Sequence, residues 1–109
     1  MIHEQYAKAI EDFAIYPDAG LQTDAEKAYL CLGLASEAGE VASLMKKEMR
    51  DAVDFPREKW MSELGDCLWY LTRLMDYYGI SLEDLMLHNV AKLHDRQQRN
   101  KLSGSGDNR

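Results

Sequence analysis

The sequence has few residues that interrupt helices and no pattern that marks β-strands. Proline occurs only twice, at positions 17 and 56, and no segment alternates polar and apolar residues with a period of two. Long stretches without proline keep the 3.6-residue period of a helix. These absences argue against a β-rich fold and favour an all-α one.

Features of secreted and membrane proteins are also scarce. Cys31 and Cys67 have no CxxC spacing, which predicts reduced, packed thiols. No apolar run approaches the roughly 18 to 20 residues of a membrane span, and the first residues lack the basic and apolar regions of a signal peptide. We therefore expect a cytoplasmic protein that does not bind membranes.

Positive charge is in deficit, and the chain is short. The net charge is −6 over 109 residues, which argues against nucleic-acid binding because that function normally needs a concentrated basic face.

A chain of this size buries only a modest core by itself. Association with further copies of the chain is expected to complete the core.

Helix start and stop signals divide the chain into four helical segments. The first covers residues 2–16 and ends at Pro17 and Gly20. The second opens at the capping-box pair Thr23 and Glu26 and lasts to about residue 50. The third has Pro56 in its first turn and runs to about residue 78, and the fourth runs from about residue 81 to about residue 101. Residues 1–102 should form one four-helix antiparallel bundle, and residues 103–109 a flexible tail.

Apolar residues recur at three- and four-residue steps on the two middle helices and predict the core. They are Ala28, Cys31, Ala35, Ala38, Ala42, Met45 and Met49 on the second helix, and Met61, Leu64, Leu68, Leu71, Met75 and Tyr78 on the third. A neighbouring stripe on each helix is also mostly apolar, but acids interrupt it.

Those acids form two pairs with the same spacing. Glu37 and Glu40 occur in "LASEAGEV", and Glu63 and Asp66 in "SELGDCLWYL". Residues three apart project from one side of a helix, and antiparallel pairing of the two helices can bring both pairs to one level. The glycines at 39 and 65 allow close helix approach or leave room for a ligand.

Four carboxylates at the edge of a core repel one another, so they need metal, protons or basic partners. All the candidate ligands are oxygens, and no histidine lies at ExxH spacing from a glutamate, so Mg²⁺, with Mn²⁺ as a possible substitute, fits better than zinc or a di-iron centre. The alternative for any one of these acids is a solvated helix face.

Cationic and aromatic residues add to this pattern. Asn89, Lys92 and Arg96 share one face of the fourth helix and suit phosphate oxygens, although such a row is also compatible with a solvated face. Tyr70 follows Asp66 by one turn and could stack on a nucleotide base.

These motifs resemble those of the all-α nucleoside triphosphate pyrophosphohydrolases, especially the short single-domain MazG-like proteins. The stretches that carry the resemblance are "GLASEAGEVASLMKKEMRD", "ELGDCLWYLTRL" and "NVAKLHDRQQRNKLSGSGDNR". The resemblance implies Mg²⁺-dependent hydrolysis of a (deoxy)nucleoside triphosphate to the monophosphate and pyrophosphate, in a homodimer or homotetramer.

The resemblance also implies roles for particular residues. The metal ligands would be Glu37, Glu40, Glu63 and Asp66, and Glu40 would also activate water. Asn89, Lys92 and Arg96 would hold phosphates, and Tyr70 would line the nucleotide pocket. Activity as a dUTPase or a phosphoribosyl-ATP pyrophosphohydrolase, and a non-catalytic nucleotide-binding or oligomerisation module, are the alternatives.

Overall fold

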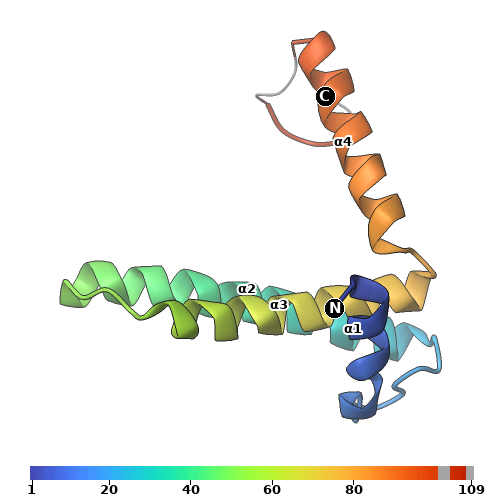
Figure 1. The fold of residues 1–109 in the computed structure, drawn as a ribbon, viewed down its shortest axis with the longest axis horizontal. Helices are drawn as coiled ribbons and strands as arrows, with labels where there is room; N and C mark the ends of the chain where they lie inside the picture. Colours follow the sequence, from blue (N-terminus) through green and yellow to red (C-terminus); the bar gives the residue numbers. More distant parts are fainter. Residues whose placement is uncertain (101–103, 108–109) are drawn as a thin grey trace. The chain divides into compact units, whose positions relative to one another are not determined.

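The chain folds entirely into helices, as the sequence predicts. The computed structural model describes residues 1–100 and 104–107, and these residues contain no strand. They form α1 (His3–Ala9), the short 3₁₀ helix η1 (Glu11–Phe13), α2 (Asp24–Asp51), α3 (Arg57–Tyr78) and α4 (Leu82–Gln98) (Figure 1). The all-α class with four α-helices is therefore confirmed. The expected flexible tail, residues 103–109, lies partly outside the described residues.

The chain divides into two compact units, Met1–Gly79 and Ile80–Arg109. In the first unit α2 and α3 run antiparallel, side by side, joined by a short loop (Figure 1). The helix α1 lies against α3, and the His3 ring is 3.0 Å from the Thr72 hydroxyl. The second unit contains α4. Among the described residues, no helix is both long and apolar enough to cross a lipid bilayer.

The first helix is shorter than predicted. It ends at Ala9, and the chain continues through η1 instead of reaching residue 16 in one helix. Ile10 and Tyr16 are both buried, and a turn between them allows both side chains to pack in the unit. Tertiary packing thus overrides a helical pattern that local propensity favours.

The predicted ends of the other helices are largely confirmed. The Thr23 hydroxyl accepts a hydrogen bond from the Glu26 amide at 3.2 Å and caps α2. Gly79 takes a left-handed conformation (φ 66°) at the end of α3, and Ser81 caps α4. Pro56 occupies the N-cap of α3 and not its first turn, and α4 ends at Gln98, before the predicted position.

The Glu26 carboxylate stabilises the loop before α2 through hydrogen bonds. Its side chain is 2% exposed and accepts hydrogen bonds from the Tyr16 hydroxyl (2.6 Å) and from the amides of Gly20 (2.6 Å) and Gln22 (2.9 Å). Buried Arg73 lies 3.9 Å away and donates to the Tyr16 oxygen. The second half of the predicted capping box is therefore wrong, because Glu26 contacts the loop and not the Thr23 amide.

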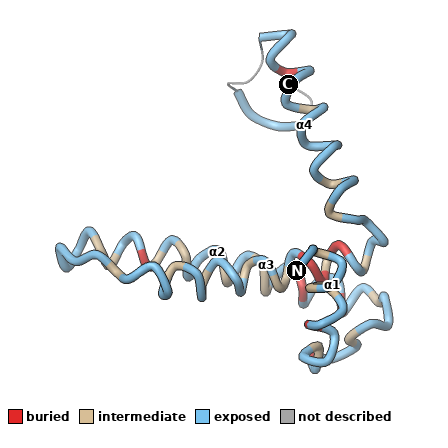
Figure 2. The backbone as a smooth tube through the Cα atoms, viewed as in Figure 1, coloured by how far each residue is buried: buried red, intermediate tan, exposed pale blue. Residues whose placement is uncertain are grey.

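The predicted core stripes face outward in this unit. Of the thirteen residues in them, only Met75 is buried, and the others are exposed. Most of the α2 and α3 backbone is accordingly coloured exposed or intermediate in Figure 2. The helices α2 and α3 face each other through the neighbouring stripes instead, which contain Leu30, Leu34, Glu37, Val41 and Leu44 on α2 and Glu63, Tyr70, Leu74 and Tyr77 on α3. Helical periodicity does not reveal which of two adjacent stripes faces the partner helix, because that depends on how the hairpin packs. Cys31 is likewise exposed and not packed.

Candidate functional site

Three of the four predicted acids meet across the α2–α3 hairpin. Glu37 projects from α2, and Glu63 and Asp66 project from α3. One carboxylate oxygen from each lies within 4.8 Å of the other two. Glu37 and Glu63 are half-buried, and Asp66 is exposed. We call these three residues the acid triad.

Glu40 lies outside the acid triad. It is exposed on α2, one helical turn beyond Glu37. Its roles as a metal ligand and as the group that activates water stay predictions.

Electrostatic repulsion is concentrated on Glu37. Burial, followed by the charges of Asp66, Glu63 and Glu40, raises the pKa of the Glu37 carboxyl. The only nearby ion pair that involves the triad, among the residues the structure describes, joins Glu63 to Lys59 at 3.7 Å. The Lys59 side chain is half exposed, so this pair compensates little of the repulsion. A bound cation would relieve it.

The acid triad fits a hard divalent cation. Oxygens that bind one Mg²⁺ at about 2.1 Å lie at most about 4.2 Å apart. Small side-chain rotations would therefore bring the three oxygens from their present spacing, within 4.8 Å, to that distance. Cys67 lies near the triad, but burial and the charges of Glu37, Asp66 and Glu63 raise the pKa of its thiol. In the described part of the chain, the ligand atoms that meet within 4.8 Å are carboxylate oxygens alone, so the donor set is oxygen.

An open pocket of about 330 Å³ adjoins two of the three acids. Glu37, Asp66, Trp69 and Tyr70 line it. The structure thus places Tyr70 beside the acids, where the sequence predicts it. The Trp69 ring meets the Tyr70 ring edge-on, with centroids 5.1 Å apart and an interplanar angle of 79°. Two polar carboxylates and two flat apolar rings therefore share one opening.

Sequence reasoning missed several neighbours of this pocket. Trp69, which follows Asp66 by three residues on α3, also lines the opening. Tyr29, on α2, lies next to Tyr70, with ring centroids 6.3 Å apart. The spacing of Tyr29, Gly33 and Glu37, at i, i+4 and i+8 on α2, was an available signal. The sequence contains no such signal for Tyr6. Burial, followed by the charge of Asp66, raises the pKa of the Tyr6 hydroxyl, so this residue of α1 lies near the site.

The glycines beside the acids have no close neighbour in this chain. A Cβ atom added to Gly39 or Gly65 would meet nothing within 4 Å among the described residues. Close approach of α2 and α3 therefore does not explain them. The glycine that does allow a close approach is Gly33, where an added Cβ would overlap the Tyr70 ring.

The predicted phosphate-binding row lies on α4, in the second unit. Asn89 is exposed, Lys92 is half-buried and Arg96 is buried. The Lys92 ammonium and an Arg96 guanidinium nitrogen each lie 3.0 Å from the same Asp107 carboxylate oxygen. Two of the three side chains thus converge on one anionic oxygen, which is the geometry that a phosphate requires.

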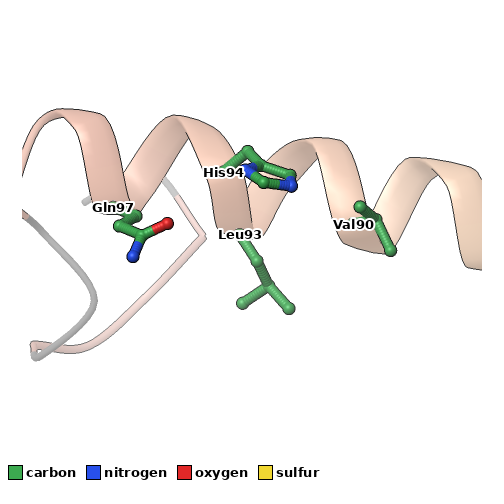
Figure 3. A pocket seen from close by; sticks show the side chains of 4 residues that line it. All are labelled: Val90, Leu93, His94 and Gln97. Atoms are coloured by element: carbon green, nitrogen blue, oxygen red, sulfur yellow. The ribbon is translucent and has the colours of Figure 1, made fainter.

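A second pocket of about 290 Å³ also belongs to α4. Val90, Leu93, His94 and Gln97 line it (Figure 3). None of the predicted site residues lines this pocket. It presents mainly hydrocarbon, so it lacks the charged groups that a triphosphate needs.

Comparisons with known proteins match most of the chain. The family model described as "MazG nucleotide pyrophosphohydrolase domain" matches residues 25–100, which include the acid triad and the α4 row. A protein of Mycobacterium phage L5, printed as "Gene 37 protein", is 38% identical over 109 residues, covering 95% of this chain and 96% of the relative. No solved structure matches the chain.

Proposed function

This chain belongs to the MazG nucleotide pyrophosphohydrolase family, and we propose that it hydrolyses a (deoxy)nucleoside triphosphate to the monophosphate and pyrophosphate. The observation that carries the proposal is the acid triad beside a pocket with aromatic walls. Carboxylates suit the cation that accompanies a triphosphate, and flat rings suit a nucleobase. One opening thus offers complementary groups for both ends of a nucleotide.

Each group has a proposed task. Glu37, Glu63 and Asp66 hold Mg²⁺, with Glu40 as a further ligand. When bound, Mg²⁺ supplies a Lewis acid that neutralises phosphate charge and lowers the pKa of water. The Glu40 carboxylate accepts the proton of the attacking water. The Tyr70 ring orients the base, and the α4 row, Asn89, Lys92 and Arg96, holds phosphate oxygens.

The reaction is tested by product identity. Incubation with a panel of NTPs and dNTPs and Mg²⁺ should release pyrophosphate and a nucleoside monophosphate from at least one substrate, detected by mass. Mn²⁺ should substitute for Mg²⁺, and EDTA should abolish release. Release of orthophosphate alone, or no release from any substrate, would contradict the proposal. Preference for dUTP or phosphoribosyl-ATP would identify the protein as a dUTPase or a phosphoribosyl-ATP pyrophosphohydrolase. Tight binding without turnover would identify it as a non-catalytic nucleotide-binding module.

We further propose that the chain forms a homodimer or homotetramer. The exposed stripe on α3, Met61 (58% exposed), Leu64 (53%) and Leu68 (39%), supports this assembly because water would otherwise contact a continuous apolar helix face. Two further expectations from the sequence, a cytoplasmic location and the absence of nucleic-acid partners, stay predictions.

Charge placed on that stripe should dissociate the assembly. Leu68→Glu buries a carboxylate in the proposed interface and should lower the molecular mass measured by light scattering to that of one 12.5 kDa chain. Ile15→Glu is the matched control, since Ile15 is 90% exposed and belongs to the segment between η1 and α2, outside the stripe on α3. An unchanged mass for Leu68→Glu, with helicity intact by circular dichroism, would exclude this interface.

A further inference from the structure

Tyr70 lies directly on the main chain of α2. A Cβ atom built on Gly33 would come far closer than 3.0 Å to three atoms of the Tyr70 ring, Cδ1, Cε1 and Cζ. No side chain larger than that of glycine fits at position 33 while the ring stays in place. Gly33 lies inside a 28-residue helix, where glycine costs about 1 kcal/mol relative to alanine. A residue that weakens its helix thus creates the space for one ring.

Two further aromatic side chains, Trp69 and Tyr29, lie against the same ring. The Trp69 ring meets it edge-on, and burial followed by a hydrogen bond with Tyr29 raises the pKa of the Tyr70 hydroxyl. Tyr29 is itself stacked on Tyr16, with centroids 4.9 Å apart and an interplanar angle of 13°. The Tyr16 hydroxyl is fixed by Glu26, as described above. The Tyr70 ring therefore ends an aromatic row that is anchored in the buried network.

We propose that Gly33 is a positioning residue for substrate binding, because its missing side chain sets how far the Tyr70 ring projects into the pocket beside Glu37 and Asp66. This inference rests on the proposed function, in which Tyr70 is a wall of the nucleotide site. With glycine at position 33 the ring lies directly against α2, and a larger side chain there would force the ring away from the helix. The displaced ring would occupy space that a planar base needs.

A double-mutant cycle in thermal stability tests the contact without any substrate. Gly33→Ala should lower Tm in the wild-type background, because the Tyr70 ring must move. It should raise Tm in a Tyr70→Ala background, because the ring is gone and alanine favours the helix. Gly39→Ala, on the same helix with nothing within 4 Å, should raise Tm in both backgrounds. A rise for Gly33→Ala in the wild-type background would overturn the proposal.

Kinetics test the consequence for substrate. Gly33→Ala should raise KM about tenfold or more, the range expected for a lost or obstructed base–aromatic stack, with a smaller change in kcat. In the Tyr70→Ala background the same substitution should leave KM unchanged. An equal effect in both backgrounds would mean that Gly33 acts without Tyr70 and would overturn the inference.

The two experiments separate the inference from the proposed function. If the wild-type protein releases no pyrophosphate, the proposed function fails, but the sign reversal in Tm still shows that Gly33 seats Tyr70. If the wild-type protein is active and the sign reversal is missing, the inference fails and the proposed function stands.

Discussion

Glu37→Gln is expected to reduce the rate of pyrophosphate release by at least about a hundredfold, since even residues that only support metal ligands contribute up to about that factor. Glu37 is the one member of the acid triad supplied by α2, and one of its carboxylate oxygens lies within 4.8 Å of an oxygen of each α3 acid. The amide keeps the size of the side chain but removes the charge that would bind the cation. Initial rates at saturating Mg²⁺, together with Mn²⁺ binding by calorimetry, measure both effects.

Glu40→Gln provides the matched comparison on the same helix. Glu40 is exposed and lies outside the triad, so its amide variant should weaken Mn²⁺ binding less than Glu37→Gln does, while turnover is lost because the amide cannot accept the proton of water. An unchanged Mn²⁺ affinity in Glu40→Gln would exclude Glu40 as a further ligand, and an unchanged rate would exclude it as the proton acceptor. Normal rate and normal Mn²⁺ affinity in Glu37→Gln would exclude the triad as the metal site.

Glu26→Gln is expected to lower the free energy of unfolding by about 3 kcal/mol, because removing one partner leaves buried Arg73 with only the exposed Asp76 carboxylate, 3.5 Å away, as a charge partner. For a domain of this size the corresponding fall in Tm is about 12 °C or more. Urea unfolding at pH 7 measures the change. Glu11→Gln, which replaces an exposed glutamate of η1, should change the free energy by less than about 0.5 kcal/mol. Equal stabilities of the two variants would show that the network contributes little.

The same network predicts a pH dependence. Burial by itself raises the pKa of Glu26, but the hydrogen bonds from Tyr16, Gly20 and Gln22 and the charge of Arg73 lower it overall. Its contribution is therefore fully present above the unfolded-state pKa of about 4.3 and is lost as pH falls through the lower folded-state pKa. The stability difference between wild type and Glu26→Gln should shrink below about pH 4. Burial and the hydrogen bond to Glu26 also raise the pKa of Tyr16 to about 12, so its hydroxyl stays a donor throughout this range.

Much of the candidate site could be predicted because it depends on spacing along single helices. Glu63 and Asp66 are one turn apart on α3, so their proximity follows from helical geometry alone. The meeting of Glu37 with them needed one further assumption, an antiparallel hairpin, which the short connection between the two helices predicts. Gly33 was missed because only the position of the Tyr70 ring across the hairpin reveals why it must be glycine.

The sequence by itself determined the all-α class, the ends of α2 and α3 and the two acid-bearing faces, because caps, glycines and the 3.6-residue period act locally. Only the tertiary structure decided which of two adjacent stripes forms the hairpin interface. It also decided that Glu40 lies outside the acid triad and that Tyr70 rests on Gly33. These outcomes depend on how two helices rotate about their own axes when they pack, and periodicity alone leaves that rotation open because both stripes are largely apolar.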